Sequence, residues 1–294
     1  IYSLGRVGNE GEFMSFIDLH CHTNASDGAL SPEGVVDRAV NYKLTHLAIT
    51  DHDTVNGIKA AQAAACGRIC VIPGIEISTT WQHQQIHIVG LFINPECSYM
   101  LNLVKEQNGK RIERAEKIGY KLSRIGFPNA YERTKAMAGD GAIITRGNYA
   151  RFLVSVGGAS STDDAFNAFL KKGKRAYVCT EWMEIGTAVE AIKQSGGVAV
   201  LAHPRRYDLT NTKLRKLIEE FKDCGGISLE VSSCQQGLND RDYLASLCRQ
   251  YDMLGSVGSD FHSEGPYRDI GRNIDLPEGI TPVWTCSEAK AYAF

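Results

Sequence analysis

Residues 18–28, with the sequence DLHCHTNASDG, place two histidines and an aspartate directly behind a short apolar segment, Phe16–Leu19. We expect that segment to form a β-strand. Side chains two positions apart in extended backbone point to the same face, so His20 and His22 can bind one metal ion. The Cys21 thiol between them then points the other way, toward packing. The stretch therefore predicts a metal-binding set at the end of a buried strand.

Four more motifs repeat this combination of histidine and carboxylate near predicted strands. They are Asp51-His52-Asp53 after Thr45–Thr50, Glu76 followed by His87, Ala202-His203-Pro204 after Val198–Ala202, and Asp260-Phe261-His262 after Leu254–Val257. In a parallel barrel the carboxyl ends of the strands meet at one rim, where barrel enzymes hold their active sites. Nine candidate ligands would converge there: His20, His22, Asp27, His52, Glu76, His87, His203, Asp260 and His262.

The nine candidate ligands exceed what one tetrahedral ion needs and suffice for two or three ions. A set of imidazoles and carboxylates without thiolates suits manganese, iron or zinc rather than a structural zinc site. Clustered ions of this kind hydrolyse phosphate esters or amides. The chain has eight histidines, and we expect the two outside these motifs, His46 and His83, to be ordinary core or surface residues.

Short apolar strands alternate with amphipathic helices over much of the chain, which is typical of an α/β fold with parallel strands. A helix is expected from Pro32 onward, because Ser31 is a suitable N-cap and proline suits the first helical position. Further helices are expected over 58–65, 186–195, 213–223 and 239–250, and further strands around 69–77 and over 86–93 and 227–231. Between about 99 and 180 the alternation stops, and a long charged helix, Tyr99–Ile125, precedes several short helices.

This pattern divides the chain into four segments. We interpret 1–13 as a flexible or non-native leader without the layout of a signal peptide, and 14–98 as the first part of the α/β host. Residues 99–180 are a helical insertion placed to cap the substrate site, and 181–294 complete the host.

Composition excludes several classes of protein. The 294 residues carry 32 basic and 34 acidic side chains, so a globally basic nucleic-acid binder is excluded, although a local basic patch is not. Apolar runs are too short to span a bilayer, so no membrane association is expected. Nine cysteines without a CxxC pair argue against a disulfide framework and for the reducing cytoplasm. No obligate protein partner is evident.

The motifs DLHCHTNASDG, AITDHDT, GIE followed by HIVG, LAHP and GSDFH together resemble the polymerase-and-histidinol-phosphatase (PHP) family of the amidohydrolase superfamily. The insertion and its surroundings, with TRGNYARFLV, GKRAYV and AHPRRYD, are similar to one branch of that family. That branch holds the 3′,5′-nucleoside bisphosphate phosphatases and a 5′→3′ exoribonuclease called ribonuclease AM. The resemblance implies a distorted (β/α)7 TIM-like barrel with a helical insertion domain and a trinuclear centre. Manganese is the first expectation for its ions, with zinc or iron as alternatives.

The resemblance also implies how the ligands are shared. A first ion would be held by His20, His22, Glu76 and Asp260; a second by Glu76, His87 and His203; and a third by Asp27, His52 and His262. Glu76 would bridge the first two ions, and Asp260 is our choice for handling a proton, so both are assigned to catalysis. The implied reaction is metal-assisted phosphoester hydrolysis in which the ribose 3′-oxygen leaves.

Substrate contacts are assigned to cationic side chains, because the planar guanidinium group matches phosphate oxygens. Arg146 and Arg206 lie in the branch motifs, and the basic run 171–175, with Lys174 and Arg175, could follow a nucleic-acid backbone. A solvated loop explains that run equally well, and a solvated helix face does the same for Lys110, Arg111 and Arg114. Two positions depart from the branch pattern: Asn148, which we also assign to substrate binding, replaces a common histidine, and Arg205 replaces a common glycine.

The sequence therefore predicts a phosphoesterase that cleaves the 3′-phosphoester of 5′-phosphorylated nucleotides. Its substrates would be small bisphosphates such as pAp, short oligonucleotides or the 5′ ends of RNA. Two alternatives stay open. One is histidinol-phosphate phosphatase, and the other, from a different class, is a noncatalytic metal-binding interaction module.

Overall fold

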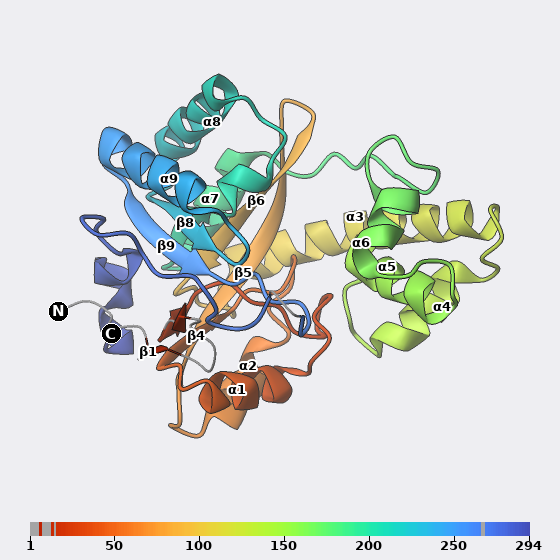
Figure 1. Cartoon of the computed structure of the whole chain (residues 1–294), viewed down its shortest axis with the longest axis horizontal. Helices are drawn as coiled ribbons and strands as arrows, with labels where there is room; N and C mark the ends of the chain where they lie inside the picture. Colours follow the sequence, from red (N-terminus) through yellow and green to blue (C-terminus); the bar gives the residue numbers. More distant parts are fainter. Residues whose placement is uncertain (1–5, 8–12, 15, 266–267) are drawn as a thin grey trace.

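The computed structural model describes residues 6–7, 13–14, 16–265 and 268–294 (Figure 1). Two short strands near the start, β1 (Arg6–Val7) and β2 (Phe13–Met14), pair antiparallel. The rest of the predicted leader, residues 1–5 and 8–12, lies outside the described residues. Among the residues that are described, no helix combines the length and the apolar character needed to cross a bilayer.

Seven strands form one sheet that curls into a nearly closed barrel, as predicted. In spatial order, which is also chain order, they are β3 (Ile17–Asp18), β4 (His46–Ile49), β5 (Cys70–Trp81), β6 (Gln84–Leu91), β7 (Val198–Leu201), β8 (Ser228–Ser233) and β9 (Leu254–Gly258). Backbone hydrogen bonds join the first and last strands: the Leu19 amide donates to the Val257 carbonyl at 3.1 Å, and the Asp260 amide donates to the His20 carbonyl at 2.8 Å.

The expectation that all strands run parallel is wrong for β6, which is antiparallel to both β5 and β7. The reason is the connection between β5 and β6. Only Gln82 and His83 separate these strands, and both residues have positive φ angles of 46° and 62°, as in a tight hairpin turn. A two-residue connection cannot hold the crossover helix that a parallel pair requires.

Gly74 marks the point where β5 changes partners. Residues 70–73 pair with β4, and residues 74–81 pair with β6. A Cβ atom at Gly74 would lie 2.8 Å from the Thr50 Cγ2 and 2.9 Å from the Gly90 carbonyl oxygen. Only glycine permits this close approach, and the predicted strand therefore continues through Pro73 and Gly74 without a break.

The strands alternate between two hydrophobic clusters. In β7, Ala199 and Leu201 pack into the large cluster with the outer helices, whereas Val198 and Val200 belong to a separate cluster. The outer helices are α1 (Pro32–Asn41), α2 (Ile58–Ala65), α7 (Ile185–Gln194), α8 (Asn211–Asp223) and α9 (Leu238–Tyr251), each within two residues of its prediction where an end was predicted. Helix α1 begins where its cap predicts, with the Ser31 hydroxyl accepting a hydrogen bond from the Gly34 amide at 3.2 Å.

The insertion forms a cap on one side of the barrel (Figure 1). It contains α3 (Ser98–Ser123), α4 (Ala130–Ala138), α5 (Arg146–Ser155), α6 (Thr162–Ala165) and one turn of π-helix, η1 (Phe166–Leu170). The first turns of α3 place Met100 and Leu103 in the barrel cluster. The last turns place Ile118 and Leu122 in a third cluster, inside the cap, which gathers residues between 115 and 178. One helix therefore belongs to both cores.

Candidate metal centre and substrate cavity

The nine predicted ligands lie together at one end of the barrel. Eight of them supply atoms to three groups in which the potential ligand atoms lie within 4.8 Å of one another. The groups are His20, His22, Glu76 and Asp260; His22, Asp27, His52 and His262; and His52, Glu76 and His87. The ninth, His203, joins through its Nε2, which lies 3.0 Å from the Glu76 Oε1.

Most of these residues follow the carboxyl end of a parallel strand, as expected, but Glu76 and His87 lie inside strands. Glu76 is in β5, and His87 is near the start of β6. Because β6 is antiparallel, its amino end lies at the rim where the parallel strands have their carboxyl ends. Ser78, two residues beyond Glu76, pairs directly with His87. The reversed strand therefore delivers a histidine to the same rim.

Glu76 lies at the centre of the cluster and is 0% exposed. Its Oε1 lies 2.8 Å from the His87 Nδ1, and its Oε2 lies 2.7 Å from the His52 Nδ1. Burial raises the pKa of Glu76, but His52 and His87 outweigh burial and hold the pKa well below its usual range. A carboxylate with histidines on both oxygens is suited to bridge two cations.

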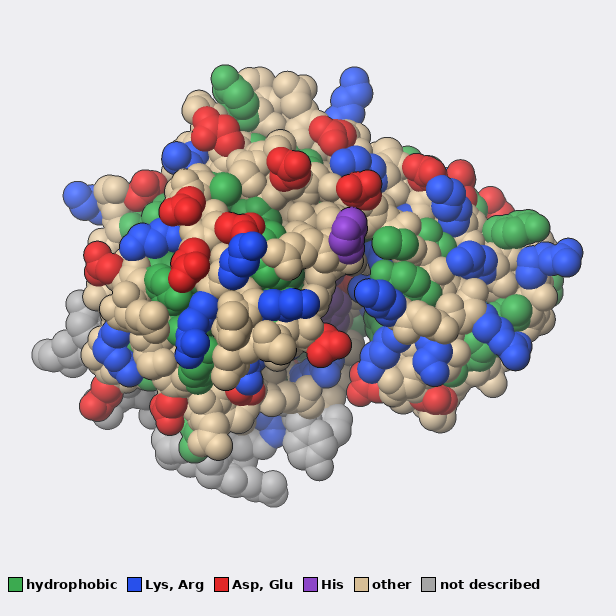
Figure 2. Space-filling model, turned by 90° about the horizontal axis from the view of Figure 1, so that it is seen from above, with side chains coloured by type: hydrophobic (Ala, Val, Ile, Leu, Met, Phe, Trp, Pro, Cys, Tyr) green, Lys and Arg blue, Asp and Glu red, His purple; other side chains and the backbone are tan. Residues whose placement is uncertain are grey.

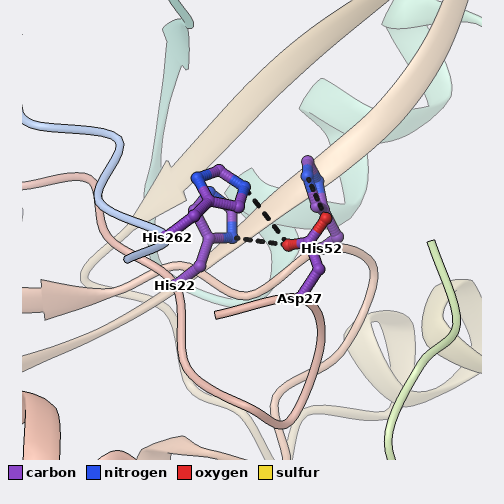
Figure 3. A group of neighbouring side chains, drawn as sticks. All are labelled: His22, Asp27, His52 and His262. Carbon is purple, nitrogen blue, oxygen red and sulfur yellow. Dashed lines mark ion pairs between the residues drawn. The ribbon is translucent and has the colours of Figure 1, made fainter. Parts of the chain in front are cut away.

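Asp27 occupies a similar position in a second set of histidines (Figure 3). Its Oδ1 lies 3.2 Å from the His262 Nε2 and 4.0 Å from the His22 Nδ1, and its Oδ2 lies 3.8 Å from the His52 Nε2. Burial lowers the pKa of His262, yet Asp27 and Asp260 outweigh it and raise that pKa to about 9. Burial lowers the pKa of His52 to about 4. The set thus combines a carboxylate with one neutral imidazole, His52, and one protonated imidazole, His262.

Several buried ligand atoms make no hydrogen bond, and this supports metal binding. They include the His22 Nδ1, the Asp27 Oδ1 and the Glu76 Oε2. Buried polar atoms are normally paired, because leaving them unpaired costs free energy. Divalent cations would satisfy these atoms, and the mixed imidazole and carboxylate set fits such ions. The cluster can therefore hold divalent metal ions.

Residues around the ligands fix their orientation. The Glu230 Oε2 lies 2.7 Å from the His20 Nδ1, a carboxylate–histidine pairing that is typical of metal sites. Sequence analysis missed Glu230, although a carboxylate inside the apolar strand Ile227–Val231 was a visible signal. Cys21 and Phe261 pack into the barrel cluster, as predicted for the residues between the ligands. Asp260 has a left-handed φ of 52°, a conformation that aspartate adopts more readily than most other non-glycine residues.

A cavity of about 640 Å³ lies between the predicted metal ligands and the cap. Figure 2 shows the hollow between the barrel and the cap, the two lobes of the molecule, with histidine side chains in and beside it. Eight lysine and arginine residues line the cavity against five aspartate and glutamate residues. Its volume is typical of sites for small ligands, and its charge favours anions.

Two arginines of the cap face this cavity without an acidic partner. Arg114 comes from α3 and Arg146 from α5, and within the described parts of the chain neither forms an ion pair. Arg114 is 5% exposed, and its Nε makes no hydrogen bond. Burial lowers the pKa of Arg114 well below its usual range, and the nearby Arg146 and Arg111 lower it further. Arg111, by contrast, is neutralised by Asp53 at 2.6 Å.

The other predicted substrate contacts divide into two groups. Arg206 lines the cavity, and its Nη1 contacts the Asp260 carboxylate. Lys174 and Arg175 are exposed and are not among the residues that line the cavity. Asn148 does not line the cavity either: its buried side chain accepts a hydrogen bond from the Thr145 amide at 2.7 Å and donates one to the Ser26 carbonyl at 3.1 Å.

Four other basic or imidazole side chains can be compared with their expected positions relative to the cavity. Lys171 and Lys172, from the same basic run, do line the cavity. Arg205 forms an ion pair with Asp240 at 2.7 Å and does not line the cavity. His83 was expected to be an ordinary residue, yet it lines the cavity from the β5–β6 turn.

Comparison with known proteins extends the likeness beyond the motifs. A model of the PHP domain matches residues 18–141. The chain is 46% identical to a 5′-3′ exoribonuclease of Haemophilus influenzae, over 91% of this chain and 97% of that protein. It is 37% identical to a 3′,5′-nucleoside bisphosphate phosphatase of Chromobacterium violaceum, over 94% and 98%. A solved amidohydrolase structure from Chromobacterium violaceum, with bound sulfate and no metal, superposes with a TM-score of 0.89 at 36% identity, over 95% of this chain and 97% of that one.

Proposed function

Because this chain belongs to the PHP family, we propose that it is a metal-dependent phosphoesterase that hydrolyses the 3′-phosphoester of 5′-phosphorylated nucleotides. One observation carries the proposal: a single cavity presents two different sites for anions. Metal ligands line it on the barrel side, and the unpaired Arg114 and Arg146 line it on the cap side. A substrate with two phosphate groups on one ribose matches this arrangement.

The two sites have different tasks. The phosphoryl group that reacts lies against the metal ligands, and the 5′-phosphate lies against Arg114 and Arg146, where each guanidinium gains the anionic partner that it lacks. A 3′-phosphate and a 3′-phosphodiester present the same scissile bond. The substrates are therefore small bisphosphates such as pAp and the 5′ ends of short oligonucleotides or RNA, as the names of the two relatives suggest.

The nine ligands hold two or three divalent cations in the sets implied by the family resemblance. The first set is His20, His22, Glu76 and Asp260; the second is Glu76, His87 and His203; the third is Asp27, His52 and His262. When bound, the cations supply Lewis-acid activation of water and of the phosphoryl group. We assign manganese to these sites, because imidazole and carboxylate donors without thiolate suit it.

We assign Asp260 to metal binding and to orienting the reacting water, rather than to donating a proton. Burial raises the pKa of Asp260, but Arg206 and His262 outweigh burial and hold the pKa well below its usual range. A carboxyl group that stays ionised is a poor general acid, and its low pKa also makes it a weak base, so Asp260 serves as a ligand and as a hydrogen-bond acceptor for the reacting water. Arg206 contacts the same carboxylate and lies where it can also reach a phosphate oxygen.

The insertion, residues 99–180, is the substrate cap, and residues 14–98 and 181–294 form the catalytic barrel. The cap supplies both unpaired arginines and also Lys171 and Lys172 at the cavity. These lysines contact the backbone of a longer substrate, and the exposed Lys174 and Arg175 extend the same basic run. Asn148 contributes by holding the start of α5, which carries Arg146.

The test is product release by manganese-loaded protein on a matched set of substrates: pAp, 3′-AMP, histidinol phosphate, and one short RNA with and without a 5′-phosphate. We expect turnover of pAp and stepwise release of mononucleotides from the 5′-phosphorylated RNA, with poor turnover of 3′-AMP. A preference for histidinol phosphate, or indifference to the 5′-phosphate, would contradict the substrate assignment. Absence of turnover on every phosphoester would favour a noncatalytic module.

A further inference from the structure

The cap touches the loop that carries Asp27, one of the predicted metal ligands. The Ile143 amide donates to the Ala25 carbonyl at 2.9 Å, and the Asn148 side chain donates to the next carbonyl in the loop at 3.1 Å. The Arg151 guanidinium donates to the backbone carbonyl of Asp27 itself. The cap segment 143–151 therefore supports this loop residue by residue.

One contact reaches the Asp27 carboxylate directly. The Thr145 hydroxyl donates a hydrogen bond to the Asp27 Oδ2, and the same hydroxyl accepts one from the Gly147 amide at 2.9 Å. The other carboxylate oxygen, Oδ1, makes no hydrogen bond and faces His262 at 3.2 Å. One oxygen is thus fixed by the cap, and the other faces the imidazoles of His262 and His22.

Gly147 fits the same arrangement. A Cβ atom at this position would lie 2.6 Å from the Asp27 Oδ2 and 3.1 Å from the Asp27 Cβ. The glycine does not have a positive φ, so its backbone would accept alanine. What excludes a side chain here is the close approach of α5 to the carboxylate.

We propose that Thr145 is a positioning residue for a divalent cation. It holds the Asp27 carboxylate so that the free oxygen binds the ion together with His52 and His262. The cap then completes a metal site whose ligands all come from the barrel. This inference rests on the metal centre of the proposed function, and partners that orient a ligand in this way typically change metal affinity by about 10- to 100-fold.

Manganese binding by the full chain tests the proposal without any activity assay. Calorimetric titration and metal analysis give the number of ions per chain and the affinity of the weakest one. We expect about three ions in the unmodified protein, and an affinity for the weakest ion that falls about 10- to 100-fold in Thr145→Val. Thr145→Ser, which keeps the hydroxyl, should restore binding.

Two further variants separate positioning from a loss of helix stability. Thr145→Val also removes the N-cap of α5, whereas Gly147→Ala raises helix propensity and pushes against the Asp27 carboxylate. We expect both to weaken the same ion, Thr145→Val by removing the hydroxyl and Gly147→Ala by displacing the carboxylate while the N-cap of α5 stays in place. Ser161→Ala is the matched control, because Ser161 caps α6 in the same domain without contacting Asp27.

The proposal is overturned if Thr145→Val and Gly147→Ala bind manganese as the unmodified protein does, or if Ser161→Ala loses as much affinity. It is also overturned if the unmodified protein binds only two ions. Manganese binding that follows the expected pattern in a protein that hydrolyses no phosphoester would support this inference while refuting the proposed function.

Discussion

Replacing Arg114 with methionine should separate recognition of the 5′-phosphate from hydrolysis. Arg114 is 5% exposed and lines the cavity, and its Nε has no hydrogen-bond partner. A hydrogen bond to a charged group contributes about 1.5–3 kcal/mol. Loss of one such contact to a phosphate corresponds to a decrease in kcat/KM of about 10- to 150-fold for pAp. The value for 3′-AMP, which has no 5′-phosphate, should stay unchanged.

The same substitution should make the protein more stable. The Arg114 guanidinium is buried beside Arg146 and Arg111, and burial together with these cations lowers its pKa well below the usual range. Methionine removes that buried charge and keeps most of the side-chain volume. The stacking of Arg114 on Trp182, at 5.3 Å from the ring centroid, is lost, but such a contact contributes about 2 kcal/mol in a buried site, less than the several kcal/mol that burial of an unpaired charge costs. We therefore expect a higher melting temperature together with lower activity on pAp.

Steady-state kinetics on pAp and 3′-AMP, together with thermal unfolding, measure both effects. Arg124→Met is the matched control, because Arg124 is exposed at the end of the same helix and does not line the cavity. An equal loss of kcat/KM on the two substrates would refute the assignment of Arg114 to the 5′-phosphate. A lower melting temperature would show that the arginine stabilises the fold instead.

Three other predictions concern stability. Asp53→Asn leaves Arg111 buried without its partner, so the free energy of unfolding should fall by about 3–5 kcal/mol in chemical denaturation, and a loss below about 1 kcal/mol would contradict the pairing. Adding manganese to metal-depleted protein should raise the melting temperature, because manganese at 100 times its Kd adds about 2.7 kcal/mol to the free energy of unfolding. An unchanged melting curve after the addition would count against the metal centre. Burial lowers the pKa of His46, so below its ordinary pKa of 6.5 the unfolded state takes up a proton that the folded state resists. Stability should therefore fall as pH drops from about 7 to about 5, and the fall should be smaller in His46→Gln; equal slopes would exclude His46 as the cause.

Patterns that depend on one segment at a time were predictable from the sequence. Apolar strands followed by histidines located the rim of the barrel, and the Ser31 cap located the start of α1. The direction of β6 was not predicted, because it depends on the turn at Gln82 and His83. These residue types are not typical of a two-residue hairpin turn, which favours glycine and asparagine.

Tertiary pairing was the other limit. Arg111 and Arg114 lie three residues apart on one helix and look alike in the sequence. Asp53 neutralises the first and leaves the second free for an anion. Glu230 pairs with His20, which is 210 residues away in the chain, and the sequence does not indicate which residues of β8 lie beside the metal centre.

Helix α3 makes the two lobes energetically inseparable. It is one element of 26 residues, about 39 Å long at 1.5 Å per residue, and its two ends are buried in different cores. Unfolding of the first turns of α3 would expose Met100 and Leu103 of the barrel core. Unfolding of the cap would expose Ile118 and Leu122 at the other end of the helix. Such a shared helix couples the denaturation of the lobes into one cooperative event. We therefore expect the part of α3 that carries Arg114 to stay ordered for as long as the barrel stays folded.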